Sequence, residues 1–314
     1  MKLRTIVLFV VLCFLWGAAY PFIKIGLEYA PPFAFGALRI VLSSILLTGI
    51  ILVIARRGPR WDRTQGWVLL LGCLNIGGLM IGMNLGLTVV SAGEGSVLIY
   101  TQPLMVALLA HVFLGERLTG GRLIGVLTGF VGMVIALSDR IRPGENPAWW
   151  GYLLLLGGAL SWSAATVLFK RLQGRLDLMW TVVLQNLYGS LPLLILVAAV
   201  ERRPIVWAPE FVILTVGLAF FSAALAYLIW FYLLSQGAAS SVSAYLFLVP
   251  VFGVLSSAVV LNERPGPAVL FGGLLIMAGI YLVNRTPRRP PSITPSPLAP
   301  ESRNVQSVGP RVRS

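Results

Sequence analysis

The sequence is short of charged residues. Only 11% of its 314 residues are charged, whereas an average soluble domain has about 25%. Hydrophobic residues make up 57% of the chain, and the mean hydropathy is +0.87. A water-facing surface needs more polar side chains than this chain supplies. The composition therefore excludes a soluble globular protein and predicts a membrane protein.

Histidine and cysteine are also scarce. His111 is the only histidine, which excludes a metal site built from several histidines. Cys13 and Cys73 both lie within apolar stretches, so we expect small packing residues and no structural disulfide. The sequence has no HExxH motif, no paired aspartates at the edge of an apolar stretch and no phosphate-binding loop. These absences argue against an enzyme, and no cofactor is expected.

What the sequence does contain is a series of long apolar runs. A helix that crosses the hydrocarbon core needs roughly 20 residues, and runs near that length recur along the whole chain. Most of the charges fall in the short stretches between these runs. The sequence therefore predicts ten transmembrane helices, at about residues 5–23, 33–55, 67–89, 95–114, 121–138, 149–169, 178–200, 210–234, 240–261 and 267–284.

The basic residues are distributed unevenly between the two sides of this arrangement. The net charge of +13 is compatible with nucleic-acid binding, but the basic residues flank the apolar runs, which favours contact with membrane lipids. If the N-terminus is cytoplasmic, 17 Lys and Arg residues lie on the cytoplasmic side and 6 on the other, with Arg39 inside a run. The positive-inside rule therefore predicts a cell-membrane protein with both termini in the cytoplasm and no nucleic-acid partner.

The second half of the chain repeats motifs of the first. The stretch 100–117, YTQPLMVALLAHVFLGER, is similar to 247–264, FLVPVFGVLSSAVVLNER, and both have a proline thirteen residues before a Glu-Arg pair. The stretch 14–24, FLWGAAYPFIK, is similar to 160–170, LSWSAATVLFK, and both have tryptophan in third place. We interpret these matches as an internal repeat.

The repeat predicts the topology. The halves are residues 1–142 and 147–285, with five predicted helices each, and an odd number makes the second half enter the membrane from the opposite side. Inverted repeats are a recurrent design of secondary transporters, which hold substrate near the midplane and work by alternating access. An ancestral duplication beneath an enzyme or a scaffold is the alternative. Residues 286–314, rich in Pro, Ser and Arg, are expected to be a disordered cytoplasmic tail.

The ordered set of motifs resembles a known family. It comprises a tryptophan followed by small residues in the first helix of each half, the Pro…Glu-Arg fourth helix and a glycine-spaced fifth helix. Over residues 1–285 this pattern is similar to the drug/metabolite transporter superfamily, in particular its EamA-type exporters. The resemblance implies an all-α polytopic membrane protein, with ten transmembrane helices as two inverted five-helix repeats around a central cavity. It also implies export of a small metabolite, amino acid or drug, without specifying which.

Aromatic residues within the predicted helices are candidates for substrate contact. Trp16 and Tyr20 lie one helical turn apart and form an aromatic wall that Trp162 is expected to face. Such a wall suits aromatic or amphipathic ligands, by stacking or by cation–π contact. Tyr100 and Phe247 occupy equivalent places in the fourth and ninth predicted helices. Interior packing is the alternative for all five.

Polar residues within lipid-crossing segments are costly and usually face the bundle interior or a wet cavity. Arg39 lies about 9 Å into the second predicted helix at 1.5 Å per residue, where it contacts an anionic substrate, ties helices together or snorkels toward the surface. Further hydrogen-bonding candidates serve either substrate binding or helix association. They are Asn75, Gln102, Gln185, Asn186 and Tyr227.

Other polar residues are interpreted as structural. His111 is expected to be packed and hydrogen-bonded, with proton transfer as the alternative. Glu94 in the first turn of a helix is favoured by the helix dipole. Glu116 and Glu263 lie at turns and are expected to stabilise the N-terminus of the helix that follows each of them. Pro103 is expected to kink the fourth helix, either as part of a cavity wall or as simple curvature.

The sequence thus predicts an exporter of a small organic molecule, with membrane lipids around it and a homodimer left open. A lipid or lipid-linked sugar flippase is the alternative of the same class. An integral-membrane enzyme lacks its catalytic residues, and a structural or receptor-like protein needs no pseudosymmetric polar cavity.

Overall fold

The computed structural model describes residues 3–55, 58–59, 61–90, 95, 98–116, 118–138, 149–260 and 267–285. Within these ranges all regular secondary structure is helical, which confirms the predicted all-α class for this part of the chain. Seven helical segments there are long and apolar enough to cross a membrane. Three further apolar helices are shorter, at Gln102–Leu114, Gly120–Ile135 and Phe271–Val283.

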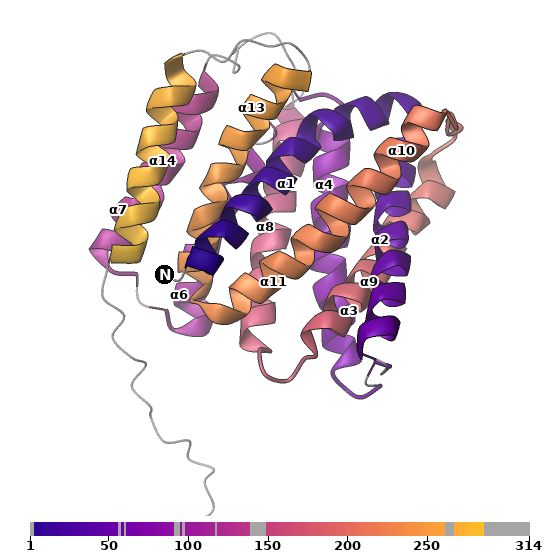
Figure 1. Ribbon diagram of the computed structural model, residues 1–314, viewed down its shortest axis with the longest axis horizontal. Helices are drawn as coiled ribbons and strands as arrows, with labels where there is room; N and C mark the ends of the chain where they lie inside the picture. The colour runs from indigo at the N-terminus through magenta and orange to yellow at the C-terminus, as the bar shows by residue number, and fades with distance from the viewer. Residues whose placement is uncertain are drawn as a thin grey trace, which may run out of the picture.

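The helices follow the predicted apolar runs closely, although several runs are made of more than one helical piece (Figure 1). The third, eighth and ninth runs each contain a segment of π or 3₁₀ helix. The elements are α1 (Leu3–Tyr29), α2 (Pro32–Ala55), α3 (Gln65–Gly72), η1 (Cys73–Gly78), α4 (Leu79–Gly86), α6 (Gln102–Leu114), α7 (Gly120–Leu137), α8 (Trp149–Arg171), α9 (Leu178–Val200), α10 (Pro209–Gly217), η3 (Leu218–Leu225), α11 (Ala226–Gln236), α12 (Ala239–Ser243), η4 (Ala244–Leu248), α13 (Val249–Val260) and α14 (Pro267–Arg285).

Local sequence signals set several helix ends. Asp177 caps α9, because its carboxylate accepts hydrogen bonds from the amides of Met179 and Trp180. Gly115 ends α6 with φ 66°, a left-handed conformation that glycine adopts without a steric penalty. Pro103 lies in the first turn of α6, where its missing N–H is tolerated. Residues 98–99 are helical and residues 100–101 form a turn, so the fourth apolar run is interrupted directly before this proline, which agrees with the predicted kink.

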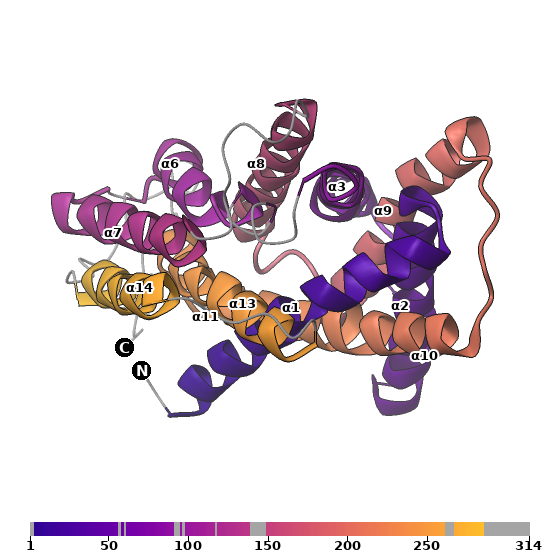
Figure 2. The ribbon, with the colours of Figure 1, turned by 90° about the horizontal axis from the view of Figure 1, so that it is seen from above.

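The bundle has two flanks joined by oblique helices. In Figures 1 and 2, α7 and α14 stand side by side at one flank, whereas α2 and α9 lie at the other. Glycines bring the backbones of α7 and α14 into contact: a Cβ on Gly279 would lie 2.5 Å from the nitrogen of Gly129 and 2.6 Å from the carbonyl oxygen of Gly125. Close approach over small residues is a common way for helices to associate in lipid.

Two π-helical segments interrupt the third and eighth apolar runs. Each has backbone carbonyl oxygens that accept hydrogen bonds from side chains of another helix. Ser161 Oγ donates to the carbonyl of Leu74 in η1 at 2.8 Å. Trp16 Nε1 donates to the carbonyl of Ser222 in η3 at 3.0 Å, and Asn186 Nδ2 donates to that of Ala223 at 3.3 Å. π-Helical turns often occur at functional sites, so the space beside η1 and η3 is a candidate functional site.

Candidate functional site

A cavity of about 50 Å³ lies between α1, α2, α4, α8 and the η3–α11 segment. Several of its residues lie near the middle of long helices: Trp16 is the fourteenth of 27 residues in α1, and Trp162 is the fourteenth of 23 in α8. The cavity is therefore far from both ends of the bundle. Its lining comprises Trp16, Ala19, Tyr20, Ile23, Arg39, Leu79, Met80, Met83, Ile99, Tyr100, Trp162, Ser222, Ala223 and Tyr227.

Aromatic rings form most of one wall. The rings of Trp16 and Trp162 meet edge to face with centroids 5.3 Å apart, so the expectation that Trp162 faces Trp16 is confirmed. Trp16 also contacts Tyr227 at 5.5 Å, and Trp162 contacts Tyr100 at 5.8 Å. Tyr20 reaches the same group, with its centroid 6.3 Å from that of Tyr100. Edge-to-face pairs of this kind contribute about 0.5–1.5 kcal/mol each, so the rings hold one another in place.

Arg39 brings a charge to this aromatic cavity. Its side chain is only 2% exposed, so it does not snorkel to the surface. Nη2 donates to the hydroxyl of Ser222 at 3.4 Å, and the guanidinium carbon lies 5.3 Å from the centre of the Phe35 ring. Nε and Nη1 are buried and have no hydrogen-bond partner. Burying a charge without an opposite charge beside it costs several kcal/mol even after relaxation, so this arginine is held at an energetic cost.

Four of the predicted polar contacts lie outside the cavity lining and join helices to one another. Asn75 Nδ2 donates to Gln185 Oε1 at 2.9 Å, which links η1 to α9. Asn186 links α9 to α2 and η3, through Ser43 Oγ at 3.2 Å and the carbonyl of Ala223. Gln102 Nε2 donates to Thr166 Oγ1 of α8 at 3.2 Å. In this conformation these side chains link neighbouring helices by hydrogen bonds. Their contact with substrate stays a prediction.

Phe247 also lies outside the cavity lining. It is fully buried, and its ring lies against α7, where a Cβ on Gly129 would be 2.7 Å from it. The structure thus brings together six of the eleven predicted site residues at the cavity. These six are Trp16, Tyr20, Arg39, Tyr100, Trp162 and Tyr227.

The cavity includes residues that sequence reasoning did not select. Met80 and Met83 form part of its wall, and Ser222 and Ala223 come from η3. Met80 and Met83 lie one turn apart, and methionine adapts its shape to irregular or variable contacts. Ser222 is a polar residue inside a strongly apolar run, which is a signal that was present in the sequence.

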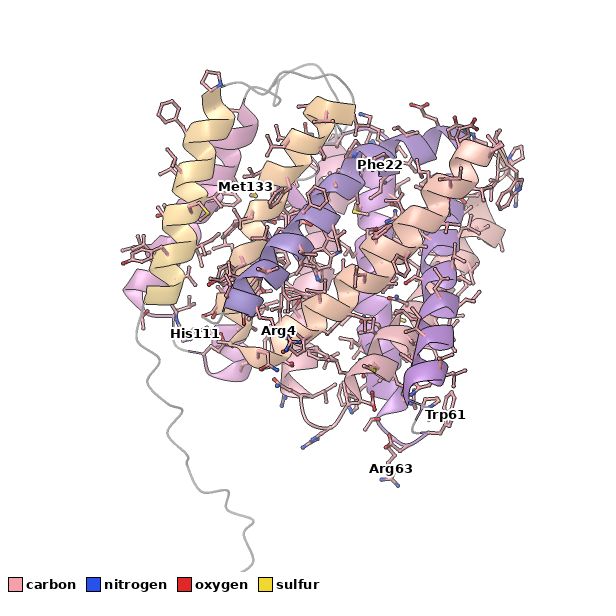
Figure 3. All side chains as sticks on the ribbon, viewed as in Figure 1. Arg4, Phe22, Trp61, Arg63, His111 and Met133 are labelled. Carbon is pink, nitrogen blue, oxygen red and sulfur yellow. The ribbon has the colours of Figure 1, made fainter. Side chains whose placement is uncertain are left out.

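His111 and Glu116 have structural roles at one end of the bundle. The expected hydrogen bond of His111 is present, since its Nδ1 donates to the carbonyl of Glu116 at 2.9 Å. The expectation that His111 is packed is wrong, because it is exposed at the end of α6 (Figure 3). The Glu116 carboxylate accepts hydrogen bonds from the amides of Ala239, at 2.7 Å, and Ser240, at 3.2 Å, in the first turn of α12. The expectation that Glu116 stabilises the N-terminus of the following helix, α7, is wrong. Gly115 forms a left-handed turn just before Glu116, the Glu116 carboxylate binds α12, and Thr119 caps α7.

Some predicted features fall outside the described residues, namely Glu94, Glu263 and the tail 286–314. Within the described ranges, no group of three His, Cys, Asp or Glu residues is placed to hold a metal ion.

A second, apolar groove of about 390 Å³ lies on the outer side of α1, against α10 and η3. Phe14, Phe22 and Phe221 form part of it and are partly exposed, and Figure 3 shows Phe22 far along α1 from Arg4. The groove shares Ala19 and Ser222 with the central cavity. The groove and the cavity therefore adjoin each other at these two small residues.

Comparison with known proteins shows which family this chain resembles. The model of the EamA-like transporter family matches residues 3–138 and again 149–285. An uncharacterised transporter of Bacillus subtilis, YvbV, is 33% identical over 90% of this chain and 92% of its own. A probable amino-acid metabolite efflux pump of Escherichia coli is 28% identical, with 85% and 90% covered. A probable terminal-alkyne amino-acid exporter of Streptantibioticus cattleyicolor is 30% identical, with 86% and 90% covered.

The fold is shared with at least one crystal structure. It superposes with a TM-score of 0.76 over 89% of this chain and 97% of the other, at 21% sequence identity. At that identity the match supports the arrangement of helices and carries no information on the ligand.

Proposed function

Because the chain belongs to the EamA-like transporter family, and is therefore an integral membrane transporter rather than an enzyme, we propose that it exports a small organic molecule by alternating access. Amino acids and their derivatives are the first candidates, since two of the relatives are named as probable exporters of such compounds.

The central cavity is the observation that carries this proposal. Its wall draws on both segments that match the family: Trp16, Tyr20 and Arg39 come from the first, and Trp162 and Tyr227 from the second. A site between two halves of a transporter, near the middle of its helices, opens to either side when the halves move against each other. At about 50 Å³ the cavity is smaller than the 300–1,000 Å³ typical of ligand pockets, so substrate entry requires a wider conformation.

We propose that the two matched segments are inverted repeats of five spanning helices each, ten in all. The seven long helical segments and three shorter apolar helices supply the elements. An offset of about 147 residues relates the repeated motifs, and the same offset places η1 upon η3. This correspondence supports a common structural unit with a π-helical segment in each repeat: η3 lines the cavity, and η1 ends directly before Leu79, which lines it.

The proposed location is the cell membrane, with both termini in the cytoplasm. The count of basic residues supports this orientation. Arg4, Trp61, Arg63 and His111 lie toward one end of the bundle (Figure 3), which is the end assigned to the cytoplasm.

Transport by purified protein in liposomes tests the proposal. Labelled amino acids, nucleosides and cationic drugs are presented in parallel, and at least one class should accumulate above the level of protein-free liposomes. If nothing in a broad panel moves, the transport proposal fails in its general form.

The apolar groove favours one second candidate, a lipid or lipid-linked sugar flippase. A groove that opens toward lipid and adjoins the cavity would give an acyl chain a path beside a polar headgroup. Movement of a fluorescent phospholipid between leaflets of the same liposomes, measured by dithionite quenching, would favour this alternative over the export of soluble metabolites.

A further inference from the structure

The cavity contains unused hydrogen-bond donors. Three buried side-chain atoms of its lining residues have no partner: Nε and Nη1 of Arg39, and Nε1 of Trp162. All three are N–H donors. Buried polar groups are satisfied in most proteins, so a set of unsatisfied groups of one kind points to a ligand of the opposite kind. The missing component is an acceptor.

The charge of the cavity gives the same indication. Arg39 is a cation that cannot lose its proton, and the described residues that line the cavity include no Asp or Glu. The side-chain hydrogen bond that Arg39 makes within the described part of the chain, to the hydroxyl of Ser222, is long at 3.4 Å and supplies no negative charge. An acceptor that carries one negative charge would satisfy the guanidinium and neutralise it.

A carboxylate fits these requirements. The planar guanidinium presents paired N–H groups that match the two oxygens of a carboxylate. Phosphate is recognised by the same fork, but a dianion would keep an excess negative charge beside a single arginine. Among the described lining residues, the hydroxyls and indoles are neutral and Arg39 is the one cation.

The aromatic wall completes the site. Trp16, Tyr100, Trp162 and Tyr227 surround the same space, and their contacts with one another leave them fixed. The face of such a ring attracts an ammonium group, and an apolar side chain packs well against it. An ammonium group can therefore be accommodated without an acidic residue.

We propose that Arg39 binds the carboxylate of a zwitterionic amino acid whose ammonium group and apolar or aromatic side chain lie against the rings of Trp16, Trp162 and Tyr227. This inference rests on the proposed function and adds to it the residue that binds the carboxylate and the rings that receive the rest of the substrate. It also explains why the sequence keeps a costly charge within an apolar bundle.

The competing explanation is that Arg39 is structural. It packs on the Phe35 ring of its own helix and reaches Ser222 of η3, so it could serve only to hold α2 against η3. A structural arginine would affect every substrate alike. A carboxylate-binding arginine affects only substrates that have a carboxylate, and this difference decides between the two.

The experiment compares L-phenylalanine, L-phenylalaninamide and phenyl phosphate. Transport is measured with the full-length protein in liposomes, and binding with the same protein in detergent, by the shift of its unfolding temperature. The wild-type protein is expected to prefer the acid over the amide at least tenfold. Arg39→Gln should remove this preference, Arg39→Lys should keep part of it, and Ser222→Ala, which leaves the charge in place, should keep it.

Each possible result either supports the binding of a carboxylate by Arg39 or contradicts it. Equal use of acid and amide by the wild-type protein overturns the inference, and so does an Arg39→Gln variant that loses both equally while remaining folded. A stronger response to phenyl phosphate than to the acid overturns the choice of carboxylate. If Arg39→Gln does not fold, the acid-to-amide ratios of Arg39→Lys and Ser222→Ala decide. Binding of the acid without transport of any compound would leave the subsite standing and overturn the proposed function.

Discussion

The indole rings of Trp16 and Trp162 meet edge to face at 5.3 Å, with an interplanar angle of 84°. They belong to α1 and α8, which occupy equivalent places in the two segments that match the family. The contact is not symmetrical, because Trp16 Nε1 bonds to the carbonyl of Ser222 and Trp162 Nε1 has no partner. Trp16 is anchored to η3, whereas Trp162 keeps a free donor at the cavity.

The two tryptophans give the first prediction. Replacing Trp162 by alanine removes ring contacts worth about 0.5–1.5 kcal/mol each, and should reduce transport by roughly 3- to 10-fold. Initial rates in liposomes measure the effect. Trp149→Ala is the matched control, because that ring is 69% exposed and lies far from the cavity in α8. Equal rates for Trp162→Ala and the wild-type protein would contradict the assigned role.

The contact between α7 and α14 gives the second prediction. A methyl group at Gly279 would meet backbone atoms of Gly125 and Gly129, which cannot give way as a side chain can. Gly279→Ala should therefore lower stability by about 1–3 kcal/mol, as overpacking commonly does. Gly273 lies on the same helix, and a Cβ added there would have no other atom within 4 Å, so Gly273→Ala should have little effect. Thermal unfolding in detergent compares them, and equal midpoints would refute the close packing.

The carboxylate of Glu116 gives the third prediction. In Glu116→Gln, one of its two acceptor oxygens is replaced by an amide nitrogen, which leaves one of the donors of Ala239 and Ser240 without a partner. Charge-assisted hydrogen bonds contribute about 1.5–3 kcal/mol, and we expect a loss of that order in the unfolding free energy. Glu28→Gln is the control, since Glu28 is exposed. A smaller loss for Glu116 than for Glu28 would argue against the cap.

Membrane orientation gives the fourth prediction. In a variant without Cys13 and Cys73, a cysteine introduced at Arg63 should react with an impermeant maleimide only from the cytoplasmic side. A cysteine introduced at Pro204 should react only from the outside, because this exposed position lies between α9 and α10. Labelling of intact cells and of inverted vesicles separates the two. The reverse pattern would overturn the proposed orientation.

The sequence predicted the helices well, because an apolar run of sufficient length has few other stable structures in lipid. It also predicted the aromatic wall. Trp16 and Tyr20 share a face through helix geometry, and Trp162 follows from the repeated motif. Both inferences use spacing within one stretch of chain or between two similar stretches.

Contacts between different helices could not be predicted in this way. The pairing of Asn75 with Gln185 depends on η1 packing against α9, which no local pattern encodes. For the same reason the target of Glu116 was assigned to the wrong helix, since its partner lies more than 120 residues away. The depth of Arg39 was predictable, but its burial depended on the cavity that the other helices enclose.

The Glu116 contact also bears on how the two halves separate. The carboxylate lies in the first matched segment and the amides of Ala239 and Ser240 lie in the second, so these bonds fasten the halves together at one end. If that end parts during the proposed alternating access, water can solvate the released carboxylate and amides and so offset much of the lost bonding. Hydrogen bonds at this end of the bundle therefore stabilise the closed arrangement, while the free-energy cost of breaking them in water is small. The cavity donors of Arg39 and Trp162 are shielded from water, and in the proposed binding mode the substrate would supply their hydrogen-bond acceptors.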